Sequence, residues 1–189
     1  RLTGLLRELL PDDAEVAGLL VLMLLSEARA AARVTAEGEL VRLDEQDRAT
    51  WNHELIDKGL VLLDGPFPAA PGRHRLLAEI NAVHVRANDA ADTDWARIVE
   101  LYERLERIDP SPVVKLSKAV ALAERDSPEK ALPLVEQLRD ALDHFHGFHV
   151  TRAELLRAAG REAEARDAYA RAIALADNVS GDDSLTLTP

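Results

Sequence analysis

An internal period of 34 residues in the C-terminal half constrains the fold of this chain more than any other feature. Small residues recur at this spacing, where Ala119 aligns with Ala153 and Ala131 with Ala165. Large apolar residues recur as well: Leu122 with Leu156, and Leu101 with Val135 and Tyr169. Such periods are typical of solenoids, because small residues let paired helices approach closely while large ones fill the space between pairs. We therefore expect an all-α fold of stacked helical hairpins.

Six helices are predicted in this half of the chain. Their spans are 73–87, 94–107, 112–125, 128–142, 147–159 and 161–176. Ser111 and Ser127 are each followed by proline, which combines an N-cap with Pro at the first helical position. Gly147 and Gly160 lie between paired helices, where a left-handed backbone is useful. The last unit, residues 155–173, resembles a tetratricopeptide repeat.

The N-terminal half is predicted to begin with two helices. One covers residues 2–10, and the next begins at Asp12 or Asp13 as its N-cap and runs to about Ala32. The second helix contains an apolar run at residues 16–25. A membrane span needs roughly 20 apolar residues, so we expect this run to be buried on all sides within the protein.

A small β-hairpin is predicted at residues 33–43, with its turn at residues 36–38. The β-branched and apolar residues on both sides of Gly38 favour this pairing. A helix should follow, capped by Asp44 or Asp47, and its apolar residues recur at helical spacing up to Leu63.

Residues 65–72 contain three prolines and mark the predicted boundary between the two halves. We expect an N-terminal half at residues 1–64, three tetratricopeptide-like helix pairs in 73–177, and a polar tail at 178–189. A short linker stiffened by proline favours one packed body, with the helix at 73–87 covering the apolar run.

The charge of the chain argues against DNA binding by these residues. The net charge is −11 and the pI is near 5.0, whereas contact with phosphates needs a basic face. Cysteine is absent, so nothing favours an oxidising compartment and we expect a cytoplasmic protein. Because the chain opens on Arg1 and its single methionine is Met23, we also expect a piece of a larger protein.

Two blocks of the N-terminal half are distinctive, residues 22–29 and 38–51, and Gln46-Asp47-Arg48 with Trp51 is their most specific part. Later segments agree with them: Ala82-Val83-His84, Thr93-Asp94-Trp95, Leu101-Tyr102, Ser111-Pro112-Val113-Val114 and Arg152-Ala153-Glu154-Leu155-Leu156. Together these segments, spread over about residues 5–178, resemble the C-terminal extension of bacterial extracytoplasmic-function sigma factors. In that group a tetratricopeptide-like domain follows two promoter-binding regions.

The resemblance implies a regulatory and protein-interaction domain for transcription initiation, and no enzyme. Its partners would be the promoter-binding regions of the same chain, the core of RNA polymerase, or both. DNA would be contacted only through those upstream regions, and neither a membrane nor a cofactor is implied. The alternative is a stand-alone helical-repeat module that binds a peptide or a small ligand in the concave face of its repeats.

The first candidate site is a polar cluster around the start of the predicted helix: Asp44, Gln46, Asp47, Arg48 and Trp51. One interpretation is a pocket for a small ligand. The other is structural, with Asp44 or Asp47 as N-cap and Arg48 as the buried partner of a carboxylate.

The second candidate site is a groove, with Asp94, Trp95, Tyr102 and Arg152 as its residues. Aromatic and charged side chains at helical spacing can line a groove that holds a peptide. The alternative interpretation is that Trp95 and Tyr102 form the packing between repeats.

The third candidate site is the densest group of titratable residues, which contains His144, His146 and His149. Three imidazoles with Asp143 could bind zinc or nickel in a metal-dependent enzyme. The alternative is an interhelical loop whose histidines cap helix ends. Because alternate spacing in a glycine-containing loop spreads ligands apart, we expect no metal here. Elsewhere the sequence lacks the catalytic motifs that would indicate an enzyme.

Overall fold

The computed structural model describes residues 10, 12–35, 38, 41–66 and 70–182, with the backbone alone for 177–182. The chain divides into two compact units, residues 1–109 and 110–189. Nine α-helices and two short 3-10 helices form within these described residues, and no strand does. None of the described helices is both long and apolar enough to cross a membrane. The predicted all-α class is confirmed.

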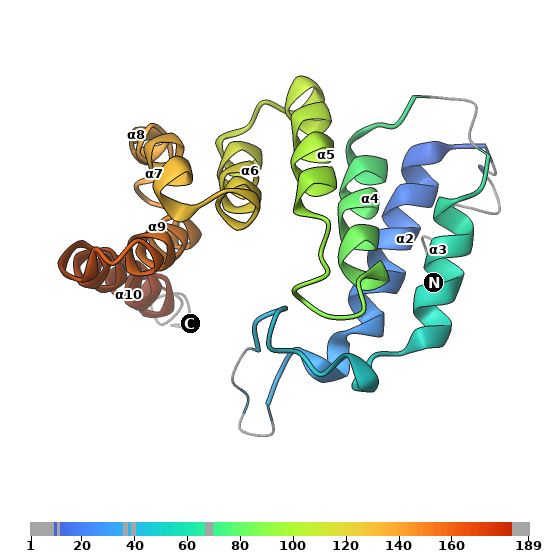
Figure 1. Cartoon of the computed structure of the whole chain (residues 1–189), viewed down its shortest axis with the longest axis horizontal. Helices are drawn as coiled ribbons and strands as arrows, with labels where there is room; N and C mark the ends of the chain where they lie inside the picture. Colours follow the sequence, from blue (N-terminus) through green and yellow to red (C-terminus); the bar gives the residue numbers. More distant parts are fainter. Residues whose placement is uncertain (1–9, 11, 36–37, 39–40, 67–69, 183–189) are drawn as a thin grey trace, which may run out of the picture. The chain divides into compact units, whose positions relative to one another are not determined.

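The first unit is built from four described α-helices that lie side by side in the order α3, α2, α4, α5 (Figure 1). Their bounds are Ala14–Ala28 for α2, His53–Leu63 for α3, Arg73–Arg86 for α4 and Trp95–Ile108 for α5. α2 packs against both α3 and α4, and α4 packs against α5. The apolar helix α2 is therefore central, and α4 is the helix that was expected to cover it.

α2 begins at the predicted cap and buries one stripe of its surface. The Asp13 carboxylate accepts hydrogen bonds from the N–H groups of Glu15 (2.8 Å) and Val16 (3.0 Å). The buried residues follow helical spacing: Ala14, Ala17, Gly18, Val21, Leu25 and Ala28. The prediction of burial on all sides was wrong, because α3 and α4 leave Met23 48% exposed.

The N-terminus of α4 is capped by a residue from α2. The N-cap position is Gly72, which has no side chain, and the Glu15 carboxylate accepts from the N–H groups of His74 (2.8 Å) and Arg75 (3.1 Å). The two backbones approach closely, since a Cβ at Gly18 would lie 2.5 Å from the Arg75 nitrogen. A carboxylate thus meets the positive end of the α4 dipole and fixes α2 to α4.

The predicted hairpin at residues 33–43 is not seen in the described part of the chain, and residues 36, 37, 39 and 40 lie outside that part. Its described arms share one backbone hydrogen bond, from Val41 N–H to the Arg33 carbonyl (2.9 Å), and Val34 forms an isolated bridge. Gly38 does adopt the left-handed backbone of a turn, with φ of 88°. One hydrogen bond and one isolated bridge in the described parts of the arms do not make a two-stranded ladder.

α3 begins later than predicted. Neither aspartate caps it, because Asp47 instead caps a 3-10 helix at Arg48–Thr50 by accepting from the Ala49 N–H (3.0 Å). The N-cap of α3 is Asn52. Trp51 therefore lies between the 3-10 helix and the N-cap of α3, and not inside a helix. Its side chain is only 4% exposed.

The second unit contains two helix pairs and one short helix. The first pair is α6 (Pro112–Arg125) with α7 (Pro128–Glu136), and the second is α9 (His146–Ala158) with α10 (Glu162–Asp182). The short helix α8 is Arg139–Leu142. The four aligned alanines are all buried: Ala119, Ala131, Ala153 and Ala165. The predicted period therefore corresponds to residues that face neighbouring helices.

The caps, glycines and helix bounds predicted for the second unit were confirmed only in part. The Ser111 hydroxyl accepts from the Val114 N–H (3.4 Å), as an N-cap should. Gly160, with φ of 73°, ends α9 in a Schellman motif. The prediction for Gly147 was wrong, because this residue belongs to the first turn of α9. The predicted helix 128–142 is also broken, since α7 and α8 are separated at residues 137–138.

The boundary between the compact units lies between Asp109 and Pro110, and the proline-rich stretch 65–72 is internal to the first unit. α4 and α5, which the sequence grouped with the C-terminal repeats, belong to the first unit. α10 continues to Asp182, so the first part of the predicted polar tail is helical. The helix predicted at residues 2–10 lies outside the described residues. The packing of both halves into one body stays a prediction.

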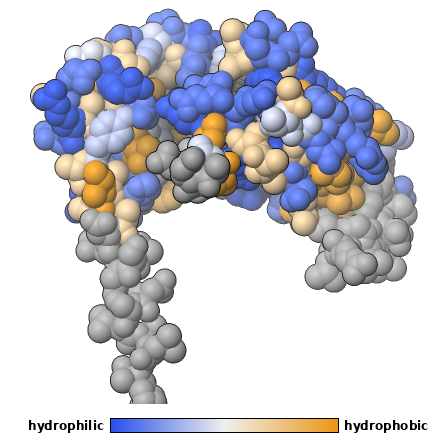
Figure 2. All heavy atoms as spheres, turned by 90° about the horizontal axis from the view of Figure 1, so that it is seen from below, coloured by the Kyte–Doolittle hydropathy of each residue, from blue (hydrophilic) through white to orange (hydrophobic). Residues whose placement is uncertain are grey.

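Most of the face shown in Figure 2 is hydrophilic, and hydrophobic residues form small, separate patches on it. This distribution agrees with the 30% of charged residues in the chain.

Candidate functional site

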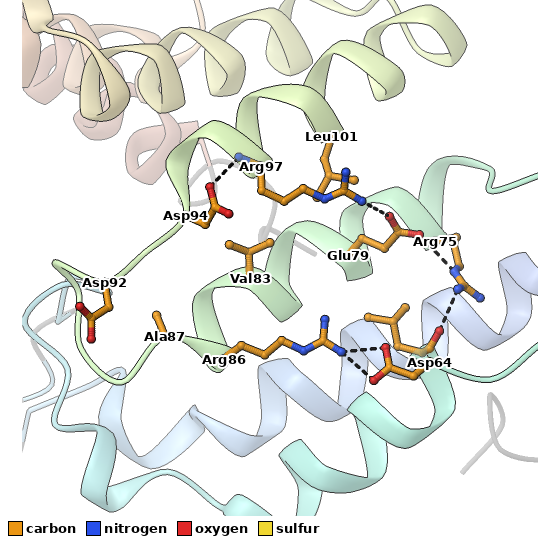
Figure 3. Close-up of a pocket in the computed structure, with 11 residues that line it drawn as sticks. Asp64, Arg75, Glu79, Val83, Arg86, Ala87, Asp92, Asp94, Arg97 and Leu101 are labelled. Atoms are coloured by element: carbon orange, nitrogen blue, oxygen red, sulfur yellow. Dashed lines mark hydrogen bonds and ion pairs between the residues drawn. The ribbon is translucent and has the colours of Figure 1, made fainter.

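A groove of about 550 Å³ follows α4 and α5 in the first unit (Figure 3). α4 supplies Arg75, Glu79, Val83 and Arg86, whose spacing places them on one helical face. The other lining residues come from the end of α3, from the loop after α4 and from α5: Leu63, Asp64, Ala87, Asp92, Asp94, Arg97 and Leu101. The groove is thus built entirely from elements of one compact unit.

The groove has charged ends and an apolar middle (Figure 3). Asp92 and Asp94 lie at one end, and Arg75 lies at the other, beside the end of α3. Val83 lies between these ends, and the fully buried Leu101 contributes to the same lining from α5. A partner with both polar and apolar groups would find a complement for each of them.

Two arginines of α4 fasten the C-terminal end of α3 at the groove. Arg75 Nη2 donates to the Leu63 carbonyl (2.8 Å), and Arg86 Nη2 donates to both carboxylate oxygens of Asp64 (2.7 Å each). Cations at a helix C-terminus complement its partial negative charge and satisfy carbonyls that have no helical partner. The contact of Arg75, whose side chain is only 16% exposed, therefore holds this end of the groove.

Glu79 is a second fixed point of the lining. Its side chain is only 19% exposed, and three guanidiniums approach its carboxylate: Arg75 at 3.4 Å, Arg104 at 3.7 Å and Arg97 at 3.8 Å. Three guanidiniums around one carboxylate leave an excess of positive charge. The exposed Glu100, which pairs with Arg97 at 3.1 Å, balances part of this excess. Arg97 thus contacts two carboxylates and faces solvent with 44% of its side chain.

The opposite end of the groove is acidic. The Asp94 carboxylate caps α5 by accepting from the Arg97 N–H (2.9 Å), and the buried Thr93 anchors the loop beside it. Asp92 is exposed, and within the described residues its carboxylate has no cation at ion-pair distance. With four carboxylates and three guanidiniums, the lining carries a net charge of −1 that is concentrated at this end.

The predicted polar cluster divides into a buried part and an exposed part. Arg48 Nη1 donates to the carbonyls of His84 (2.8 Å) and Ala87 (3.0 Å) at the C-terminal end of α4. Its guanidinium also stacks over the Trp51 ring at 4.6 Å. The prediction of a carboxylate partner for Arg48 was wrong. The carbonyls at the C-terminal end of α4, which carries partial negative charge, accept from its guanidinium instead.

The remaining members of the cluster do not converge on a ligand pocket. Asp44 pairs with Arg42 (3.2 Å), and both side chains are more than half exposed. Gln46 donates from Nε2 to the Val41 carbonyl (3.2 Å), while its Oε1 is buried without a partner in the described residues. The structural interpretation of this cluster therefore accounts for more of its contacts than the ligand pocket does.

A second arginine lies near Trp51, because the Arg29 guanidinium is 6.0 Å from the ring centroid. Arg29 donates to the Asn81 Oδ1 (3.1 Å), and burial, with Arg33 and Arg48 nearby, lowers the pKa of its guanidinium. Burial, Arg29 and Arg48 lower the pKa of His84 to about 4. His84 is therefore neutral near pH 7.

The residues of the second predicted site are placed differently from one another. Asp94 lines the observed groove, whereas Trp95 contacts the edge of the His84 ring, with centroids 5.3 Å apart, and Tyr102 is half-buried on α5. Arg152 belongs to the second unit, where its Nε donates to Glu136 (2.6 Å). One of these four residues thus belongs to the groove that the structure describes.

The three histidines of the third candidate site have different surroundings. His149 is buried and its Nε2 lies 2.7 Å from the Asp143 carbonyl, while His144 and His146 are exposed. No group of three potential metal-ligating side chains occurs in the part of the chain that the structure describes. His149 contributes to the packing of α9, beside the ring of Phe148.

Most of the groove lining was missed by the sequence analysis, although a signal for it exists. Arg75, Glu79, Val83 and Arg86 recur at spacings of three and four residues on a predicted helix. This pattern puts opposite charges on one face, which indicates a polar face rather than a core face. Only the structure shows that a matching face of α5 lies opposite.

Comparisons with known proteins give the following relationships. A family model described as "Family of unknown function (DUF6596)" matches residues 1–66. The "Uncharacterized protein R00370" of Rhizobium meliloti (strain 1021) is 44% identical over 181 residues, which cover 95% of this chain and 43% of that protein. No solved structure matches the chain. The chain is thus similar to DUF6596 over its first 66 residues and, over almost its whole length, to less than half of a larger bacterial protein.

Proposed function

We propose that this chain is the regulatory, protein-interaction domain of a bacterial sigma factor of the extracytoplasmic-function group. It docks on the promoter-binding regions of its own protein, on the core of RNA polymerase, or on both. In this role it acts by binding and performs no catalysis. The observation that carries the proposal is the groove along α4 and α5, whose charged ends and apolar middle suit a protein segment.

The positions of the sigma-like segments support this assignment. Arg48 and Trp51, from the most specific block, hold the C-terminal end of α4. Val83 and Asp94, from later blocks, line the groove itself. Segments that are far apart in the sequence thus serve one groove, directly or by supporting it.

The fold supports the assignment in a second way. We assign the pairs α6 with α7 and α9 with α10 as tetratricopeptide-like repeats, since their aligned alanines are buried between helices and a left-handed glycine ends α9. Solenoids of this kind present extended surfaces to protein partners. Stacked helical pairs therefore suit a domain that regulates by docking.

The charge and the larger relative are also consistent with the proposal. Promoter-binding regions need basic side chains to contact phosphates, and this chain carries a net charge of −11. More than half of the similar Rhizobium meliloti protein lies outside the aligned part. That relative therefore has room for further regions. The polymerase is cytoplasmic, so the proposal also assigns the chain to the cytoplasm.

The test is reporter transcription by the complete factor with and without residues 1–189, combined with pull-down of this domain against the separate promoter-binding regions and against core polymerase. We expect the deletion to change transcription and at least one partner to be retained. Unchanged transcription and no retention of either partner would contradict the proposal.

A stand-alone binding module is the second candidate function, because the groove volume falls within the range of sites for small ligands. In that case no promoter-binding regions would precede residue 1 in the gene. The upstream gene sequence distinguishes the two candidates.

A further inference from the structure

The chemistry of the groove along α4 and α5 indicates which kind of segment it accepts. We propose that the groove binds an extended segment of the partner protein in which an apolar side chain lies between a basic and an acidic one. This inference rests on the proposed function, since it specifies where the docking partner binds and what it must carry.

The acidic end of the groove selects the basic side chain. Asp92 has no cation at ion-pair distance within the described residues, and Asp94 adds a second carboxylate that accepts one backbone hydrogen bond. Two exposed carboxylates at one end of the groove attract a lysine or an arginine, and this attraction should weaken with added salt.

The guanidiniums of Arg86 and Arg97, which lie between Val83 and Arg75, select the acidic side chain (Figure 3). Arg86 and Arg97 have 46% and 44% of their side chains exposed, so each can receive a further carboxylate. Asp64, which pairs with Arg86, and Glu100, the nearer partner of Arg97, are themselves more than 60% exposed, while Glu79 lies farther from Arg97, at 3.8 Å. Exposed ion pairs of this kind contribute little stability, and a ligand carboxylate can therefore replace them.

The middle of the groove selects the apolar side chain and sets the direction of the segment. Val83 lies between the two charged ends, and the basic residue of the partner must lie toward Asp92 (Figure 3). The contacts of Arg75 with Leu63 and with Glu79 hold the walls in place before binding. A groove held in this way loses little conformational entropy when a partner binds.

The first test uses blocked synthetic peptides that share flanking residues and differ only at their centre: Lys-Leu-Glu, Lys-Leu-Lys, Glu-Leu-Glu and Gln-Leu-Gln. Each is titrated into the 189-residue chain while backbone amide shifts are followed by NMR. We expect saturable shifts at Val83, Ala87, Asp92 and Arg97, and the tightest binding for Lys-Leu-Glu. Equal affinities for the four peptides, or shifts confined to other residues, would overturn the inference.

The second test changes the charge at each end of the groove. Asp92→Lys should weaken binding of Lys-Leu-Glu on the order of tenfold and improve that of Glu-Leu-Glu. Arg97→Glu should also weaken binding of Lys-Leu-Glu, and it should improve that of Lys-Leu-Lys. Glu103→Lys and Arg107→Glu are matched controls, because they make the same charge changes at exposed positions of α5 outside the lining. Variants with the parent melting temperature that bind all four peptides as the parent does would contradict the inference.

The same variants separate this inference from the proposed function. If pull-down of the promoter-binding regions or polymerase succeeds and neither Asp92→Lys nor Arg97→Glu affects it, the groove inference fails while the proposed function stands. If the peptides bind as expected and neither partner is retained, the proposed function fails and the groove binds a segment of another protein. If free glutamate and lysine together bind with the affinity of the peptide, the groove is a site for small molecules. This result would overturn the inference that it binds a protein segment.

Discussion

Trp51 illustrates how one residue can join several elements. Its ring is buried with Val21 and Leu25 of α2 and Ala82 of α4, and the guanidinium of Arg48 stacks on it. That guanidinium also satisfies two carbonyls at the end of α4. One aromatic side chain therefore positions the arginine that closes the helix on which the groove is built.

Replacement of Trp51 by alanine should lower the free energy of unfolding by about 3–5 kcal/mol, because it removes a large side chain that is 4% exposed. Trp51→Phe should cost less, since the indole Nε1 has no hydrogen-bond partner among the described residues. Chemical denaturation monitored by circular dichroism gives both values. Met23→Ala, at a position that is 48% exposed, serves as the control, and an equal loss in that variant would contradict the assignment.

His84 should make the stability of the first unit depend on pH. Its pKa falls from the usual 6.5 to about 4 on folding, so the unfolded chain binds more protons between these values. The free energy of unfolding of the first unit should therefore have its full value above about pH 6.5. It should decrease as the pH falls toward 4, by up to about 3 kcal/mol. Denaturation at a series of pH values, compared with His84→Gln, measures this change. A pH dependence that is the same in both proteins would show that other groups cause it.

At the scale of elements, the contact between α2 and α4 depends on two residues of one helical turn. Glu15 caps α4 from outside, and Gly18 lets the two backbones meet. A helix that lacks a side-chain cap of its own, as α4 does at Gly72, relies on such a neighbour for its first N–H groups. The position of the groove therefore depends on α2, although α2 supplies none of its lining.

Glu15→Ala should destabilise the chain by about 1–2 kcal/mol, because it leaves the N–H groups of His74 and Arg75 without their acceptor. Hydrogen exchange should accelerate in the first turn of α4 before it does in α5. Glu27→Ala, an exposed change on the same helix, is the matched control. A Glu15→Ala protein with unchanged exchange at α4 would contradict the capping role.

At the scale of the whole molecule, the division between Asp109 and Pro110 predicts how fragments behave. A fragment of residues 110–189 retains a complete apolar core between α6 and α10 and should fold. A fragment that begins at Arg73 exposes the face of α4 that packs on α2, so its α4 and α5 should be unfolded or aggregated. Circular dichroism and hydrogen exchange compare the two fragments. Native protection of α4 in the longer fragment would show that α2 is dispensable.

Trp51 and Trp95 both belong to the first unit, so their fluorescence reports on that unit alone. We expect single-tryptophan variants to unfold at one temperature, because α4 contacts both the Trp51 core and α5. Clearly different melting temperatures would divide the first unit itself.

The charge of the chain predicts its behaviour toward DNA. With a net charge of −11, the isolated chain should not retard promoter DNA in a gel at physiological salt, since attraction to phosphate is reversed in sign. Under the proposed function, the positive control is the complete sigma factor, which would carry the promoter-binding regions. Retardation by the isolated chain that weakens steeply with added salt would reveal a basic face.

The sequence alone determined the helical class, most helix bounds and several caps. Asp13, Ser111 and Gly160 act within a few residues of their own position, so local rules were sufficient for them. The period of 34 residues also identified alanines that are buried in the second unit. Local rules were wrong where competing caps lay close together, as with Asn52 and Asp47 before α3.

Only the tertiary structure decided how the groove is assembled. The Glu15 cap on His74 spans 59 residues and the Arg48 contact with Ala87 spans 39, and no periodicity within one helix specifies such partners. The spacing of charged residues in α4 predicts that they share one face. Whether that face lines a groove depends on α5, which lies beside it. Helical periodicity defines which residues share a face, whereas burial and charge pairing between distant segments determine which faces meet.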